Sequence, residues 1–202
     1  MKVALIGATG RVGSRLAAEL VSRGHTVTGI SRHAAAEGPA GIPVIEADAT
    51  NPGSLAPHLS GHDAVISATR FVTSDAEALI AAIKTAQVQR LLVVGGAGSL
   101  EVAPGKRLLD TEGFPEAFKT EAQAGARFLE RLRAERDLDW TFLSPSADFA
   151  PGERTGQFRL GDDQLLSDAE GKSHISMEDF ALAMVDELEQ LVHSHQRFTV
   201  GY

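Results

Sequence analysis

A glycine-rich stretch near the start of the chain has the residue types and spacing of a phosphate-binding turn. Gly7-Ala8-Thr9-Gly10-Arg11-Val12-Gly13 follows an apolar run and precedes a helical pattern. Gly7 permits a tight turn, Gly10 lets the backbone approach a pyrophosphate, and Gly13 lets the helix pack closely. Free N–H groups at a helix N-terminus also attract an anion. The alternative is a glycine-rich turn without ligand, since the spacing is Gly-x-x-Gly-x-x-Gly rather than Gly-x-Gly-x-x-Gly.

The residues after the second expected strand indicate which dinucleotide would bind. NAD-binding proteins usually place Asp or Glu there for the ribose hydroxyls, whereas Ile30 is followed by Ser31-Arg32-His33. The planar guanidinium of Arg32 could bind a 2′-phosphate, with the Ser31 hydroxyl as a further contact. The alternative is that Arg32 is a solvated surface residue. The pattern therefore predicts NADPH in preference to NADH.

Alternation of short apolar runs with amphipathic segments predicts the elements that position these residues. The expected strands span 2–6, 26–30, 43–46, 63–67, 90–94, 140–143 and 198–200. The expected helices span 11–23, 52–59, 75–88, 120–136 and a segment from the Ser176 cap to about 192. This order predicts a Rossmann-like, doubly wound parallel sheet in a three-layer α/β/α arrangement. We expect one domain over 1–202, with substrate-side loops at 96–119 and 145–173.

Composition excludes several classes of protein. The 202 residues include no cysteine, so disulfides, thiolate catalysis and zinc–thiolate sites are excluded. The net charge of −8 disfavours nucleic acid and anionic membrane surfaces. No apolar run approaches the roughly 20 residues of a membrane span, and the N-terminus lacks a signal pattern. We therefore expect a cytoplasmic monomer or homodimer that binds a small-molecule acceptor, without nucleic acid, membrane or metal.

Six segments resemble, in order, those of a known family. They are GATGRVG (7–13), ADAT (47–50), VISA (65–68), VGGAGS (94–99), TFLSP (141–145) and ISMED (175–179). The set is similar to the atypical short-chain dehydrogenase/reductases. Within these it is nearest to small NAD(P)H-binding proteins named NADH-flavin reductases, which are related to the NmrA-like group and to biliverdin reductase B. The resemblance spans nearly the whole chain and is specific for fold and cofactor, but hardly for substrate.

The resemblance implies a role for each matching residue. Residues 9–13 would hold the pyrophosphate, Arg32 the 2′-phosphate, and residues 48–49 the adenine; Asp48 could equally be a turn residue. Residues 67–70 would line the cofactor cleft, 95–97 would pass under the nicotinamide, and 144–146 would bound its far side. The expected cofactor-binding residues are thus Gly7, Thr9, Gly10, Arg11, Val12, Gly13, Ser31, Arg32, Asp48, Ala49, Ser67, Ala68, Thr69, Arg70, Gly95, Gly96 and Pro145.

One departure from the wider family concerns the proton donor. Short-chain dehydrogenases commonly use a Tyr-x-x-x-Lys dyad, but the only tyrosine of this chain is Tyr202, the last residue. Ser99, Lys119 and His174 are candidates to polarise an acceptor, and we take Ser99 and Lys119 as the candidate catalytic residues. Each also has a plainer interpretation: Ser99 as a turn cap, Lys119 as a solvated lysine and His174 as a backbone contact.

Two further groups of residues carry weaker hypotheses. Five phenylalanines fall in or beside the loops at the expected carboxyl ends of the strands, where they would suit a flat, conjugated acceptor, although any one of them could be a core residue. They are Phe71, Phe114, Phe118, Phe149 and Phe158. His193 and His195 do not have metal-ligand spacing, and we expect them at a solvated helix end.

These observations favour an NADPH-dependent oxidoreductase that transfers hydride to a planar acceptor such as a flavin or quinone. Hydride transfer itself needs no protein acid, because the cofactor supplies the hydride. The alternative is an NADP(H)-binding redox sensor of the NmrA type, without turnover. An epimerase or dehydratase is disfavoured, because the tyrosine–lysine dyad is missing.

Overall fold

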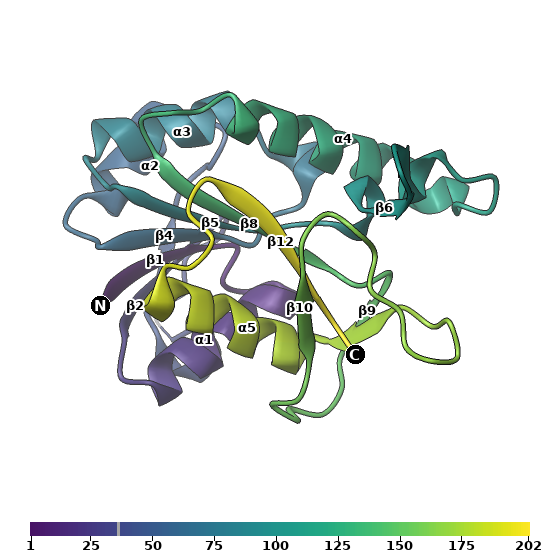
Figure 1. The fold of residues 1–202 in the computed structure, drawn as a ribbon. Coiled ribbons are helices and arrows are strands. Elements are labelled where there is room, and N and C mark those ends of the chain that lie inside the picture. The colour runs from purple at the N-terminus through teal and green to yellow at the C-terminus, as the bar shows by residue number, and fades with distance from the viewer. Residues whose placement is uncertain (36) are drawn as a thin grey trace.

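The computed structural model describes residues 1–35 and 37–202 and is built around one large sheet (Figure 1). Its eight strands lie in the order β10-β12-β8-β5-β4-β1-β2-β3. All neighbouring strands are parallel except β10, which is antiparallel to β12. The strands are β1 (Lys2–Ile6), β2 (Thr26–Ser31), β3 (Val44–Glu46), β4 (Ala64–Ser67), β5 (Arg90–Val94), β8 (Asp139–Pro145), β10 (Arg159–Gly161) and β12 (Gln196–Gly201).

Helices cover both faces of the sheet (Figure 1). On one face lie α1 (Arg11–Ser22) and α5 (Met177–Gln190). On the other lie α2 (Pro52–Leu59), α3 (Ala76–Thr85) and α4 (Glu116–Arg133). This arrangement confirms the expected Rossmann-like, doubly wound α/β/α fold.

Local sequence explains why the elements begin and end where they do. All five residues of β5 are buried, as expected for a parallel strand covered on both faces. The side chains of Asn51, Asp75 and Ser176 accept hydrogen bonds from backbone N–H groups in the first turns of α2, α3 and α5. Past the end of α1, Gly24 adopts a φ of +80°, which glycine tolerates without strain.

The two expected loops contain more regular structure than their composition indicated. In the first lie η3 (Ala97–Ser99), β6 (Glu101–Ala103), β7 (Lys106–Arg107) and η4 (Leu108–Asp110), and α4 begins at Glu116, four residues earlier than expected. In the second, β8 extends through Pro145. There β9 (Asp148–Ala150) pairs in parallel with β11 (His174–Ser176). Strands this short have too few residues for a detectable hydrophobic period.

The two loops are also joined to each other. The backbone N–H of Glu101 donates to the Asp163 carbonyl at 2.8 Å, and that of Leu165 donates to the Glu101 carbonyl at 2.8 Å. In Figure 1, β6 and β9 lie at the same end of the molecule as the C-terminus, where the parallel strands finish. None of the helices in the described part of the chain combines the length and hydropathy needed to cross a bilayer.

Glu135, just after α4, is a buried carboxylate with several donors. It lies 2.7 Å from Lys84 Nζ and accepts from Arg131 and from the backbone N–H of Arg136 and Asp137. The hydrogen bond from Lys84 is the main cause that lowers its pKa from 4.5 to about 2, against the opposing effect of burial. The charged form is therefore preferred in the folded state.

We expect Glu135→Gln to lower stability in a pH-dependent way. A depressed carboxyl pKa stabilises the fold above the unfolded value, near 4.5, and this contribution disappears as the pH falls through about 2. Urea unfolding at pH 7 should show the variant less stable than the wild type, and the gap should close in acid. A gap that is the same at pH 7 and at pH 3 would contradict this assignment.

Candidate functional site

The glycine turn between β1 and α1 has the geometry that its spacing predicted. Gly7 has a φ of +82°, and a Cβ there would lie 2.6 Å from the Ala68 carbonyl oxygen. A Cβ on Gly13 would lie 2.0 Å from the Gly7 carbonyl oxygen, closer than any real contact. On Gly10 it would lie 3.2 Å from the same oxygen. A side chain at residue 7 or 13 would thus clash with the backbone of the protein itself. Among the described residues, the Gly7 carbonyl oxygen is the one neighbour within 4 Å of such a Cβ at Gly10.

The N-terminus of α1 is left open for an anion. Gly10 is its N-cap and has no side chain to cap it, and no acidic residue lies in its first turn. Among the described residues, no acceptor is found for the backbone N–H groups of Arg11, Val12 and Gly13. Free amides and the positive end of the helix dipole favour a phosphate at this position. These residues therefore fit a pyrophosphate.

The end of β2 lies beside this turn. Thr9 Oγ1 and Ser31 Oγ are 3.2 Å apart, which ties the glycine turn to the β2 end. Arg32 is exposed and forms no ion pair with any other described residue. Its charge helps to lower the pKa of Asp48, although hydrogen bonds from Thr50 are the larger cause. The exposed Arg32 therefore directly follows Ser31, which contacts the glycine turn.

Asp48 behaves as a turn residue in this structure. Its Oδ1 accepts from the Thr50 N–H at 2.9 Å and from the Thr50 hydroxyl at 2.7 Å. Ala49 beside it packs partly against the core. One carboxylate oxygen of Asp48 thus serves the turn, as the turn interpretation expects. The contact of residues 48–49 with adenine stays a prediction.

Residues 67–70 continue the same edge after β4. The Ala68 N–H donates to the Ile6 carbonyl at 2.8 Å, and hydroxyl groups of Ser67, Thr69 and Ser74 form a chain of contacts. Arg70 is largely exposed, with Nη2 3.6 Å from Glu121 Oε2. The contact of Arg70 with a phosphate stays a prediction.

The expected nicotinamide end is shaped by close packing. A Cβ on Gly95 would lie 2.3 Å from the ring of Phe142, so glycine is required there with or without a cofactor. Gly96 is less confined, because a Cβ there would lie 3.8 Å from the ring of Phe71. Pro145 is buried at the end of β8 and pairs with Val200 of β12.

The two candidate catalytic residues lie in different environments. Ser99 is half-buried in η3, and its hydroxyl lies 3.4 Å from Arg197 Nη1. Lys119 is on the exposed side of α4, with Nζ 3.3 Å from Glu116 of the same helix. No hydrogen bond joins Lys119 to Ser99 among the described residues. The solvated interpretation suits Lys119, whereas Ser99 is held by a buried partner.

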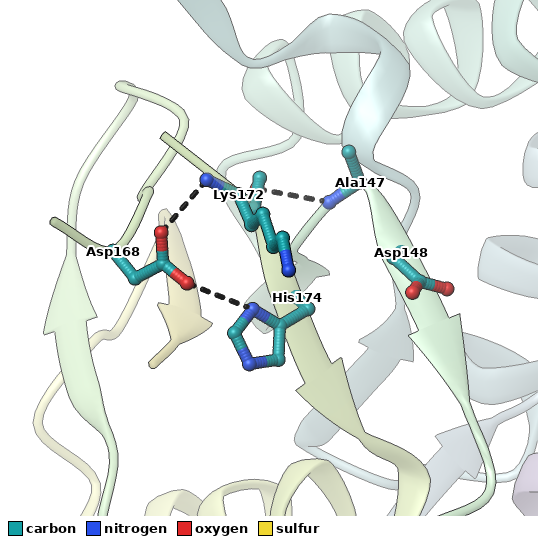
Figure 2. A pocket seen from close by; sticks show the side chains of 6 residues that line it. Ala147, Asp148, Asp168, Lys172 and His174 are labelled. Atoms are coloured by element: carbon teal, nitrogen blue, oxygen red, sulfur yellow. Dashed lines mark hydrogen bonds and ion pairs between the residues drawn. The ribbon is translucent and has the colours of Figure 1, made fainter. Parts of the chain in front are cut away.

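His174 lines a pocket beyond β8, together with Ala147, Asp148, Asp168, Lys172 and Ser173 (Figure 2). The pocket has a volume of about 780 Å³. The imidazole Nδ1 lies 3.7 Å from Asp168 Oδ2, and its ring packs against that of Tyr202 with centroids 5.0 Å apart. Among the described residues, the His174 side chain makes no hydrogen bond to a backbone group, so the backbone-contact interpretation is wrong.

Tyr202 is committed to a structural cluster. Its hydroxyl lies 2.7 Å from Asp179 Oδ2 and 2.9 Å from Ser176 Oγ. Burial opposes ionisation of Asp179, but the hydrogen bonds from Thr155 and Tyr202 outweigh it and lower the carboxyl pKa. Burial, followed by the bond to Asp179, raises the Tyr202 pKa. This tyrosine does not stand in for the missing dyad.

The five phenylalanines do not form one lining. Phe71 is buried against Phe128 and Phe142, with ring centroids 5.3 and 5.9 Å apart. Phe149 and Phe158 pack against the core on the opposite face of the sheet, while Phe114 is half-buried and Phe118 is 63% exposed. The core interpretation therefore holds for Phe71 and Phe149, and the shared lining is wrong for these two.

Of the two histidines near the end of α5, His195 is exposed as expected, whereas His193 is not solvated. His193 Nδ1 lies 2.7 Å from Glu187 Oε2, and its ring stacks on Phe198. Glu187 in turn pairs with the buried Arg90 at 2.8 Å. Within residues 1–35 and 37–202, no three His, Asp or Glu side chains gather closely enough to hold a metal ion.

Sequence reasoning missed Arg197 and Asp163. Arg197 is a buried arginine in β12, bound through Nε to Asp163 Oδ1 at 2.7 Å. The only signal was a cation next to the apolar run 198–200, which usually marks the exposed end of a strand. The pairing depends on a loop 34 residues away, which no local pattern reveals.

The sheet order, the glycine turn and the open helix end together define a nucleotide-binding protein of Rossmann-like fold. Residues 7–191 match the family described as NAD(P)H-binding, and the chain belongs to that family.

Solved structures support the same assignment. A protein of Burkholderia pseudomallei, provisionally named an exported protein, is 48% identical with a TM-score of 0.92 over all of both chains. One of Bacteroides thetaiotaomicron, provisionally named an epimerase, is 43% identical with a TM-score of 0.93, over 100% of this chain and 96% of the other. One of Streptococcus pneumoniae, provisionally named an NADH-flavin reductase, is 38% identical with a TM-score of 0.87, over 100% and 99%.

We expect Gly13→Ala to damage both folding and cofactor binding. The added methyl carbon would stand 2.0 Å from the Gly7 carbonyl oxygen, so α1 must move away from the turn. We expect a loss on the order of 3 kcal/mol in urea unfolding and loss of NADPH binding by titration. Gly53→Ala is the matched control, because its methyl would meet only Asn51 Oδ1, at 3.5 Å. Wild-type binding by the Gly13 variant would refute the role of close packing.

Proposed function

We propose that this protein is an NADPH-dependent reductase of planar acceptors such as flavins and quinones. The observation that carries the proposal is the open N-terminus of α1, together with the exposed Arg32, for which the described residues provide no ion-pair partner. Together these groups offer backbone amides to a pyrophosphate and a guanidinium to a third phosphate. The Streptococcus relative, provisionally named an NADH-flavin reductase, supports a flavin as acceptor.

The preference for NADPH rests on Arg32. The residue that follows β2 selects between ribose hydroxyls and a 2′-phosphate, and no carboxylate stands at that point of the chain. Asp48 is close enough for Arg32 to affect its pKa, but it is turned into a bond with Thr50. Arg32 is therefore available to a dianionic phosphate.

When bound, NADPH supplies the hydride, and the chain supplies orientation and electrostatics. We assign polarisation of the acceptor to Ser99 rather than Lys119, because Ser99 follows Gly95–Gly96 at the expected nicotinamide end and is half-buried. Lys119 is solvated and paired within its own helix. Flavins and quinones can take their proton from water, so the missing tyrosine is no obstacle. A cytoplasmic location and a monomer or homodimer remain predictions.

We expect Arg32→Asp to weaken NADPH binding at least about tenfold and NADH binding far less. The change removes the charge that meets the 2′-phosphate and adds a carboxylate that suits ribose hydroxyls. Titration of nicotinamide fluorescence measures both affinities. Arg127→Asp, on the exposed side of α4, makes the same change in net charge and should alter neither. Equal losses for the two nucleotides would refute the phosphate assignment.

We expect NADPH to be oxidised when FMN, riboflavin or a quinone is added. The measurement is absorbance at 340 nm with a panel of acceptors, corrected for the rate in buffer. Binding of NADPH without turnover on any acceptor would favour the redox-sensor alternative. Turnover with flavin or quinone would exclude a sensor without activity.

A further inference from the structure

Arg197 is the most deeply buried guanidinium on the α4 side of the sheet near the expected nicotinamide end. Its side chain is 2% exposed, and it lies opposite Phe142 of β8. Asp163 is its counter-ion, with Oδ1 2.7 Å from Nε and in contact with Nη2 as well. Burial lowers the pKa of Arg197 and Asp163 opposes this, so the guanidinium stays charged at neutral pH. The head group is thus held in one orientation.

The remaining edge of this guanidinium faces two hydroxyl groups. Nη1 lies 3.4 Å from both Ser99 Oγ and Ser144 Oγ, and Nη2 lies 3.5 Å from the Ser99 carbonyl oxygen. Arginine can only donate, so the Ser99 oxygen accepts from it. The hydroxyl proton of Ser99 is then left to donate elsewhere. A hydroxyl that accepts from a cation is also a stronger donor, because hydrogen bonds polarise one another.

We propose that Arg197 is a positioning residue, which directs the Ser99 hydroxyl toward the acceptor and strengthens it as a donor. The inference rests on the proposed function and deepens it. As hydride reaches the acceptor, its two electrons place negative charge on an acceptor heteroatom, and the hydrogen bond from Ser99 stabilises that charge. No bond of Ser99 breaks, and the additional proton comes from water.

A purely structural role for Arg197 is the competing explanation, since Asp163 ties the two loops together. Arg133 provides the control that separates these roles. Its Nη2 binds the same Asp163 Oδ1 at 3.0 Å, but it does not contact Ser99 in the described structure. Loss of Arg133 therefore weakens the anchoring of the Asp163 carboxylate without removing a contact to Ser99.

The test is a double-mutant cycle on Ser99→Ala and Arg197→Met, with Arg133→Met as control. We measure kcat and KM for FMN reduction, NADPH affinity by fluorescence, and hydrogen exchange of residues 97–101. Each of the two single variants should lower kcat about tenfold with NADPH affinity within about twofold, because only acceptor polarisation is lost. The double variant should have a kcat no lower than that of Ser99→Ala.

Hydrogen exchange of residues 97–101 should be faster in Arg197→Met and unchanged in Arg133→Met. If Arg197→Met does not fold, Arg197→Lys replaces it in the same cycle.

Two results would overturn the inference: losses that multiply in the double variant, or an Arg133→Met variant as slow as Arg197→Met. Failure of the proposed function looks different, since the wild type itself would then not oxidise NADPH with FMN. In that case the exchange at 97–101 still decides whether Arg197 holds the Ser99 segment, and unchanged exchange would refute the contact as well.

Discussion

The close approach of α1 to the turn after β1 is the constraint on which the site depends. A side chain at residue 13 would overlap the Gly7 carbonyl oxygen, so the helix can lie this near the turn only because residue 13 is glycine. The first amides of α1 have no acceptor among the described residues, at the edge where β1, β2 and β4 end. At this edge Thr9 Oγ1 lies 3.2 Å from Ser31 Oγ, and the Ala68 N–H donates to the Ile6 carbonyl. The shape of this edge therefore depends on the absence of side chains at Gly7 and Gly13.

The repeating half of the fold could be predicted from the sequence for physical reasons. Strands such as 90–94 are continuous apolar runs, and helices such as 52–59 begin at a proline after a capping asparagine, so local signals and tertiary packing agree. The expected bounds of 2–6, 52–59 and 90–94 match the structure. Where packing overrides local signals, ends shift by a few residues, as at Thr85 of α3 and Glu116 of α4.

The structure of the two loops, 96–119 and 145–173, could not be predicted to the same extent. Its elements are two or three residues long, and they are held by contacts between distant segments, such as Glu101 with Asp163 and Tyr202 with Asp179. No periodicity in the sequence encodes such pairs. The same limit explains why Phe71 and Phe149, which looked like one lining, are placed on opposite faces of the sheet. The glycine turn, by contrast, could be predicted from the sequence, because the need for glycine there comes from local backbone geometry.

Backbone hydrogen bonds join Glu101 to residues 163–165, two segments that are far apart in the sequence. These segments lie beyond the carboxyl ends of β5, β8 and β12, and they pack there as one structural unit. A change in the length or backbone path of one segment would break these hydrogen bonds unless the other segment changed as well. Among relatives, these two stretches should therefore diversify together, and a transplant of one alone into this scaffold would leave backbone groups without partners. A redesign of this end of the molecule therefore has to exchange both stretches together.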